Sequence, residues 1–290
     1  MNETEKKEAS FDDIENWETP KLLEELLNSQ NKSFIAVKNA LKDIELAVSA
    51  TIKKIKKTNS KIVYVGAGTS GRIGAIDGVE LIPTFGWPDD RVQFCFSGDN
   101  PLKPTEGSED SEELAIKHFN DKKINQDDVV IGIAASGSTK YTLKIIELSK
   151  NIGSLTIGIS NNKNSLLSKL SEFKICLETG SEFLAGSTRL AAGTSQKIAL
   201  NLFSTSLMIK LNRVYKGFMI DVIASNEKLK KRAQFILSEI TGCPEETAIK
   251  YLTQTNYNIR MSIMLFHNYS IEEAKKVLEL NDNNLHKILK

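Results

Sequence analysis

Short apolar runs alternate with longer amphipathic stretches through the middle of the chain. The runs are rich in Val and Ile, which favour strands, and we expect strands at 62–65, 92–96, 129–134, 155–159 and 173–177. Helical spacing of apolar positions follows them near 70–80, 109–122, 139–150 and 163–170, and a long helix is expected to open near Ser187. Strands that alternate with helices in this way predict an α/β fold with a five-stranded parallel sheet covered by helices on both faces.

The flanks of this central region have only helical periodicity. Thr19 is expected to cap a first helix with Pro20 at its first position, and apolar residues recur from Phe34 to Ile55 as one further helix. Residues up to about Ser10 are expected to be disordered. After Asp221 a helix is expected over 226–240, followed by a small three-helix bundle of the ubiquitin-associated type, read as a structural cap, with helices at 245–252, 259–266 and 271–280.

These changes of pattern suggest a division of the chain into three parts. We expect an N-terminal helical segment at 1–58, a central α/β domain at 59–222 and a helical C-terminal region at 223–290. The apolar stripes of the N-terminal helices and of 198–208 suggest a homodimer, although intramolecular packing is the simpler explanation for the N-terminal stripe.

Composition narrows the possible partners. The 38 Lys and Arg balance the 37 Asp and Glu of the 290 residues, so no overall field favours nucleic acid or an anionic membrane. The three cysteines are widely separated and none forms a Cys-x-x-Cys pair, which argues against disulfides and structural zinc, and no metal is expected. No apolar run has membrane-spanning length, so we expect a cytoplasmic protein.

A glycine-rich loop follows the first strand. Gly66, Gly68 and Gly71 allow the backbone to approach a ligand closely, and Thr69 and Ser70 add hydroxyl groups at the start of the next helix. Such a loop suits an anion, but the same glycines also serve ordinary strand–helix turns.

Two further loops carry the same chemistry. Ser136, Ser138 and Thr139 follow the third strand, and Ser187 precedes the long helix. One such loop is most simply explained by helix capping. Three together at the carboxyl edge of a parallel sheet predict a phosphate cradle that needs neither Lys nor metal.

A dinucleotide site fits the sequence less well. It requires an acidic residue at the end of the second strand to hold the ribose hydroxyls. Asp89 and Asp90 precede that strand and Asp99 follows it late, so a nucleotide cofactor is not favoured.

An ordered set of motifs resembles the N-acetylmuramic acid 6-phosphate etherase family, from about Ile14 to the C-terminus. The matches with that family are 65–74, Asp77, Glu80, 83–86, 106–110, 132–137, 186–190, 192–194, Gln196, Lys197, Lys210, Val214, Tyr215, Met219, Asp221, Val222 and 226–229. The resemblance implies a sugar isomerase (SIS) fold, binding of a phosphosugar, and cofactor-free cleavage of a lactyl ether by elimination and hydration in cell-wall sugar recycling. It also implies catalytic roles for Glu80 and Glu109 and a homodimer.

The local sequence around each glutamate suggests which one acts as the base and which one as the proton donor. Ser108 is expected to cap the helix that Glu109 opens, where the helix dipole favours an ionised carboxylate, so Glu109 is expected to be the base. Glu80 is expected at the far end of the helix that starts at Ser70, among apolar neighbours. Dipole and burial would both raise its pKa and keep it protonated as the proton donor.

Substrate contacts are expected from the hydroxyl loops: Thr69, Ser70, Ser136, Ser138, Thr139 and Ser187. The family usually has Arg-Thr-Pro-Tyr after the second Ser-Gly pair, whereas this chain has Ser138-Thr139-Lys140-Tyr141. Two other functions are compatible with the same fold, an aldose–ketose phosphosugar isomerase and a non-catalytic phosphosugar sensor such as the glucokinase regulatory protein. Retention of both glutamates favours catalysis over sensing, and the Pro-Thr-Phe-Gly sequence at 83–86 after Glu80 favours the etherase over an isomerase.

Overall fold

A computed structural model of the chain describes residues 2–98 and 107–289. Asp99 and Glu106, which entered the sequence analysis, lie outside these residues. Internal contacts divide the chain into two compact units. Unit 1 comprises Met1–Gly78 and Asp90–Ser204, and unit 2 comprises Val79–Asp89 and Thr205–Lys290. The three-part division expected from the sequence stays a prediction.

Unit 1 is built on a five-stranded sheet in the order β2-β1-β3-β4-β5, with every neighbouring pair parallel. Each strand falls where the alternation of apolar runs predicted one. The strands are β1 (Ile62–Gly66), β2 (Val92–Phe96), β3 (Val129–Ile133), β4 (Leu155–Ser160) and β5 (Phe173–Cys176). Every residue of β1, β3 and β4 is buried, as expected for strands covered on both faces.

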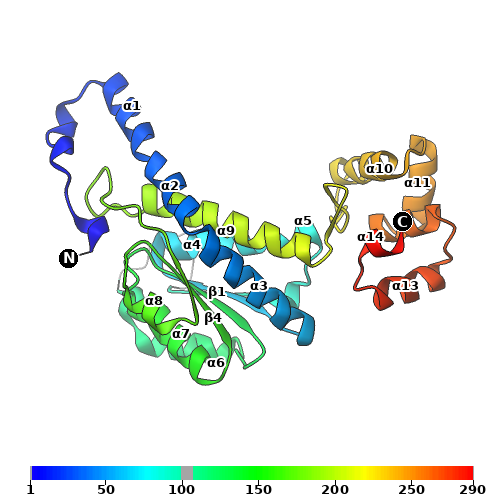
Figure 1. Cartoon of the computed structure of the whole chain (residues 1–290), viewed down its shortest axis with the longest axis horizontal. Helices are drawn as coiled ribbons and strands as arrows, with labels where there is room; N and C mark the ends of the chain where they lie inside the picture. The colour runs from blue at the N-terminus through cyan, green and yellow to red at the C-terminus, as the bar shows by residue number, and fades with distance from the viewer. Residues whose placement is uncertain (1, 99–106, 290) are drawn as a thin grey trace. The chain divides into compact units, whose positions relative to one another are not determined.

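Helices cover both faces of this sheet, as predicted (Figure 1). On one face, Val63 and Val65 pack with Ile145 and Ile146 in the layer formed by α6 (Glu112–Asp121), α7 (Lys140–Asn151) and α8 (Leu166–Leu170). On the other face lie α3 (Leu41–Lys57), α4 (Gly68–Val79) and the first turns of α9 (Ala191–Lys210). The α/β fold is therefore confirmed.

The N-terminal part of unit 1 differs from the expectation in two respects. The single helix expected from Phe34 to Ile55 is broken at Ala40 into α2 (Asn31–Asn39) and α3, and it follows α1 (Thr19–Ser29), whose N-cap is Glu18 instead of Thr19. The first residues, expected to be disordered, form short 3-10 turns at Glu3–Glu5, Ala9–Phe11 and Ile14–Asn16, and Thr4 is fully buried.

Unit 2 contains the helical C-terminal region that the sequence predicted. Its elements are α5 (Leu81–Phe85), the hairpin β6 (Val214–Tyr215) and β7 (Phe218–Met219), α10 (Glu227–Thr241), α11 (Glu245–Gln254), α12 (Ile259–Phe266), α13 (Ile271–Leu280) and α14 (Leu285–Ile288). A common core of Ala248, Leu252, Ile263, Ala274 and Leu278 joins α11, α12 and α13, which confirms the small bundle. Within the described ranges of the chain, no helix is both long and apolar enough to cross a membrane.

Candidate functional site

The glycine-rich loop makes a tight turn between β1 and α4. A side chain at Gly66 would bring its Cβ within 2.7 Å of the Gly71 Cα, and Gly68 has a φ of +50°. The loop therefore depends on glycine for close approach at Gly66 and for backbone conformation at Gly68. Thr69 and Ser70 stand in the first turn of α4, as the sequence predicted.

The start of α9, which follows the loop that carries Ser187, lies against this turn. A Cβ built on Gly193 would be 3.6 Å from the Thr69 Cγ2 atom and 3.3 Å from the carbonyl oxygen of Thr188. A Cβ at Gly193 would thus meet Thr69 at an ordinary van der Waals distance and the Thr188 carbonyl oxygen more tightly, which places the start of α9 beside Thr69. The glycine-rich loop and the start of α9 are therefore neighbours in unit 1.

The Ser136–Thr139 loop leaves the carboxyl end of β3 and leads into α7. Thr139 is the N-cap of α7, yet its side chain makes no capping hydrogen bond, while the Ser138 amide donates to the Ser136 hydroxyl at 3.2 Å. Gly137 is held tightly, because an added Cβ would lie 2.4 Å from the Oγ of Ser165. The loop is fixed at its glycine, and it presents the exposed Ser138 and the half-buried Ser136 and Thr139.

A buried polar network, which the sequence analysis did not identify, ties the end of β4 to α9. The Asn161 side-chain amide donates to the Ser195 hydroxyl at 2.8 Å, and the Gln196 amide donates to the Asn161 oxygen at 2.9 Å. The pair Asn161-Asn162 directly after a buried strand was the available signal, because two amides at that position need buried partners. The network positions the sheet edge on which the hydroxyl loops stand.

The N-terminal segment packs on the same edge of the sheet. The Glu3 amide donates to the Asn162 side-chain oxygen at 2.8 Å, and the Gly186 amide donates to the Thr4 carbonyl oxygen at 3.1 Å. A carboxylate oxygen of Glu5 lies 2.8 Å from the position of a Cβ on Gly186, next to Ser187. Residues that composition marked as disordered therefore border the candidate site.

The start of α9 corrects a prediction. The helix begins at Ala191, so Ser187 lies in the preceding loop and does not open the helix. The amides of Ala191 and Ala192 each donate at 2.9 Å to the carboxylate of Glu182, which is 1% exposed. Burial raises the pKa of Glu182, and the two amide hydrogen bonds oppose this rise. The N-terminus of α9 is already occupied by a side chain of this protein.

Glu109 also stands in a different local structure from the one predicted. It lies in the 3-10 turn Ser108–Asp110, and the N-cap of α6 is Ser111, whose hydroxyl accepts from the Leu114 amide at 3.1 Å. Ser111 has the capping geometry and Ser108 does not, so the dipole of α6 begins beyond Glu109. The Glu109 side chain is exposed.

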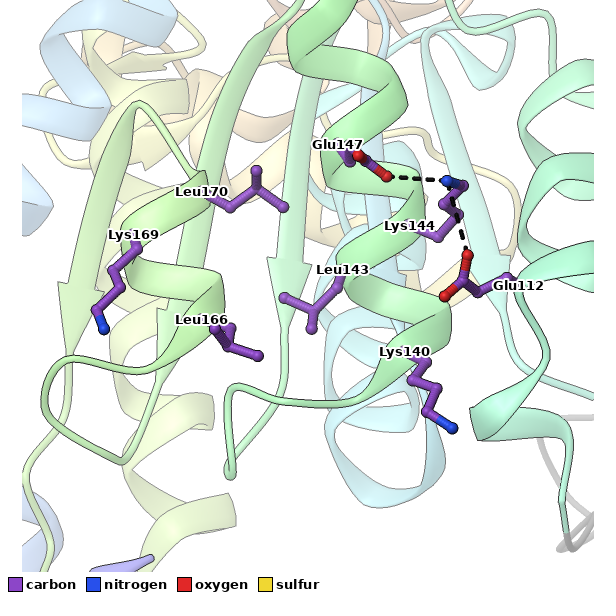
Figure 2. Close-up of a pocket in the computed structure, with 8 residues that line it drawn as sticks. All are labelled: Glu112, Lys140, Leu143, Lys144, Glu147, Leu166, Lys169 and Leu170. Carbon is purple, nitrogen blue, oxygen red and sulfur yellow. Dashed lines mark hydrogen bonds and ion pairs between the residues drawn. The ribbon is translucent and has the colours of Figure 1, made fainter.

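Lys140 links the turn of Glu109 to the Ser136–Thr139 loop. Its ammonium lies 3.6 Å from the carboxylate of Asp110, and both side chains are exposed. Lys140 stands on the first turn of α7, beside a groove of about 380 Å³ that Leu143, Leu166 and Leu170 line (Figure 2). The replacement of the family's usual arginine segment thus leaves a cation next to the Glu109 turn.

Glu80 follows the last residue of α4, as predicted, but its surroundings differ. It is the N-cap of α5, makes no side-chain capping bond, and is exposed in the single chain. The burial expected from its apolar neighbours is therefore wrong, because Val79 is itself exposed while Leu81 is buried.

A buried carboxylate near the end of α4 was part of a motif without an assigned role. Asp77 accepts hydrogen bonds from the Tyr64 hydroxyl at 3.0 Å and the Ser204 hydroxyl at 3.2 Å, and Lys197 lies 3.5 Å away. Burial raises the pKa of Asp77, against the lowering effect of Lys197 and of the hydroxyl donors. Asp77 joins α4 to β1 and α9. Among the described residues, no group of three or more His, Cys, Asp or Glu is placed to hold a metal ion.

Comparison with known proteins gives the family context. Residues 43–150 match the glucokinase regulatory protein N-terminal SIS domain, and residues 108–206 match the SIS domain. A protein of Mycoplasma mycoides subsp. mycoides SC named N-acetylmuramic acid 6-phosphate etherase is 37% identical over 99% of this chain and 96% of its own length. Proteins with the same name are 38% identical in Geobacillus thermodenitrificans (99% and 98% covered) and 41% identical in Bacillus cereus (84% and 84% covered).

Solved structures support the fold alone. An Escherichia coli CFT073 protein solved in complex with a ligand superposes with a TM-score of 0.50 at 18% identity, over 69% of this chain and 96% of that protein. A Bacteroides fragilis protein described as a candidate phosphosugar isomerase gives a TM-score of 0.51 at 21% identity, over 65% and 91%.

Proposed function

Because this chain belongs to the N-acetylmuramic acid 6-phosphate etherase family, we propose that it cleaves the D-lactyl ether of N-acetylmuramic acid 6-phosphate. The products are N-acetylglucosamine 6-phosphate and D-lactate, and the enzyme is a carbon–oxygen lyase. The observation that carries this function is the 37% identity to an etherase-named relative over nearly the whole of both chains.

The reaction starts from the opened sugar, in which the hydrogen on carbon 2 lies next to the aldehyde. Glu109 takes this proton, and the electron pair first forms an enolate and then the double bond between carbons 2 and 3. The bond from carbon 3 to the ether oxygen breaks, and Glu80 protonates the departing lactate oxygen. Water then adds across the double bond, its oxygen to carbon 3 and a proton to carbon 2, which restores the sugar.

The hydroxyl loops are proposed to hold the phosphate and sugar hydroxyls. Thr69 and Ser70 act with the first-turn amides of α4, and Ser136, Ser138 and Thr139 act at the start of α7. Ser187 contributes from a loop, since Glu182 occupies the amides of α9. The contact of the Thr69 side chain with the start of α9 supports a shared cradle.

The exposure of both glutamates in the single chain favours a homodimer in which a second copy shields the reaction from water. Large apolar side chains on α1, α2 and α3 offer a surface for it, since Leu27 is 72% and Phe34 67% exposed. We place this activity in the cytoplasm, in the recycling of peptidoglycan sugar, with no cofactor and no nucleic-acid or membrane partner.

One incubation separates this function from the two alternatives. Purified protein mixed with N-acetylmuramic acid 6-phosphate should release D-lactate stoichiometrically with N-acetylglucosamine 6-phosphate. Binding without lactate release would indicate a phosphosugar sensor. Conversion of an aldose phosphate to a ketose phosphate, without lactate from the ether substrate, would indicate an isomerase.

A further inference from the structure

A cluster of two arginines and one aspartate lies inside unit 2. The carboxylate of Asp221 accepts two hydrogen bonds from Arg260, from Nε at 2.9 Å and from Nη2. The Arg260 side chain is 7% exposed and the Asp221 side chain 13%. Because burying charges is costly, such a bidentate pair needs all its groups satisfied.

Arg260 also fastens other segments to this pair. It belongs to α12 of the C-terminal bundle, and its Nη groups donate to the carbonyl oxygens of Asn212 at 2.8 Å and of Asn283. Arg260 therefore joins the bundle to Asn212, just after α9, and to Asp221, just after the β6–β7 hairpin.

Asp221 is connected in turn to α5, the short helix whose N-cap is Glu80. Arg213 lies 3.4 Å from the Asp221 carboxylate and donates to the carbonyl oxygens of Phe85 at 3.2 Å and Gly86 at 3.0 Å. These carbonyls end α5, whose N-cap is Glu80. Arginine thus satisfies the open end of this short helix.

The backbone on either side of Asp221 closes on the same segment. The Ile223 amide donates to the Pro83 carbonyl oxygen at 3.1 Å. A Cβ on Gly86 would lie 2.5 Å from the Asp221 carbonyl oxygen, so the backbone segments at Gly86 and Asp221 are in direct contact. An unbroken series of contacts therefore connects the bundle to α5, through Arg260, Asp221 and Arg213.

We propose that Arg260, Asp221 and Arg213 are positioning residues for Glu80, and that the C-terminal bundle serves to brace the proton donor. This inference rests on the proposed role of Glu80. Loss of the brace leaves the base and the phosphate cradle intact, since their residues belong to unit 1, and it affects the protonation of the leaving oxygen.

The experiment measures lactate release and exchange of the carbon 2 hydrogen in Arg260→Lys and in Arg213→Lys. Lysine keeps the charge but lacks the fork that holds two acceptors at once. We expect lactate release to fall by about 10- to 100-fold, as for a misplaced catalytic group, with KM nearly unchanged. Exchange of the carbon 2 hydrogen with deuterated solvent should persist at close to the wild-type rate, as in Glu80→Gln.

A matched control is Ser270→Ala, which removes the capping box of α13 in the same bundle without touching Asp221. It should lower lactate release and exchange only in proportion to any unfolded fraction. Folding of each variant is followed through the emission of Trp87 in a Trp17→Phe background, because the Arg213 guanidinium lies 5.5 Å from the centre of the Trp87 ring. Changed Trp87 emission in the folded Arg260→Lys variant, which keeps Arg213, supports a moved segment.

The outcomes distinguish the brace from the function beneath it. Suppose that Glu80→Gln stops lactate release and keeps exchange, while both lysine variants lose exchange and lactate release in parallel or lose neither. The proposed positioning of Glu80 by the two arginines is then wrong, and the role of Glu80 as proton donor stands. If Glu80→Gln itself fails to separate them, the role of Glu80 falls and the brace falls with it.

Discussion

The hydroxyl of Thr4 accepts a hydrogen bond of 3.1 Å from the side-chain amide of Asn162, 158 positions further along the chain. The same Asn162 amide group donates to the Ala135 carbonyl oxygen at 2.9 Å, one residue before Ser136. Thr4 therefore helps to order the loop at the end of β3, and the N-terminal segment contributes to the candidate site through Asn162.

Replacing Thr4 by Val tests this contact. The change removes the acceptor and leaves one buried amide hydrogen of Asn162 without its partner, which should lower the free energy of unfolding by about 1–2 kcal/mol. Urea unfolding measures it. Thr253→Val is the control, because the exposed Thr253 hydroxyl donates to the Ile249 carbonyl oxygen on the exposed face of α11, and a change within about 0.5 kcal/mol is expected. Equal effects at the two positions would contradict the burial argument.

Asp77 should make stability depend on pH. Its native pKa is raised, mainly by burial, so the native state binds this proton more tightly than the unfolded state does. The resulting stabilisation is complete below the unfolded pKa of about 3.9 and is lost as pH rises through the raised native value. Asp77→Asn removes this contribution. The unfolding free energy of the wild type minus that of the variant should decrease with pH across this window, and an increase would mean that the native pKa is lowered.

The glycine-rich turn offers a steric comparison between neighbouring positions. Gly66→Ala places a Cβ 2.7 Å from the Cα of Gly71, a backbone atom that cannot rotate away. The Cβ of Gly68→Ala meets no atom within 4 Å, so this variant is destabilised only by its left-handed backbone at a φ of +50°, which costs about 1–2 kcal/mol. Gly66→Ala should therefore lower the thermal midpoint far more than Gly68→Ala. The reverse order would show that the turn is not closed as described.

Ser70 is the sharpest test of the phosphate cradle. Loss of one hydrogen bond to a charged phosphate weakens binding by about 1.5–3 kcal/mol, so Ser70→Ala should raise KM by about 10-fold or more. Ser111→Ala serves as control, because it removes the N-cap of α6 and costs stability without touching the substrate. Steady-state kinetics at a temperature where both variants are folded gives the answer. An unchanged KM for Ser70→Ala would remove Ser70 from the cradle.

The centre of the sheet was predictable because β1, β3 and β4 are buried on both faces, so Val and Ile runs such as 129–133 mark these strands. The cap of α9 could not be predicted, because Glu182 accepts from amides 9 and 10 residues further along the chain, beyond the reach of any local capping pattern. Local rules also could not choose between Ser108 and Ser111, which both precede acidic residues. The burial of Thr4 depends on Asn162, and composition contains no information about so distant a partner.

The roles of the two glutamates can be read from a single pair of variants in deuterated water. Glu80→Gln should still exchange the carbon 2 hydrogen of N-acetylmuramic acid 6-phosphate while releasing D-lactate at least about 100-fold more slowly, because general acid catalysis contributes that much. Glu109→Gln should lose exchange and lactate release together. Mass spectrometry of the recovered substrate and enzymatic assay of lactate report both steps. Exchange that survives in Glu109→Gln, or lactate release that is unaffected in Glu80→Gln, would contradict the proposed mechanism.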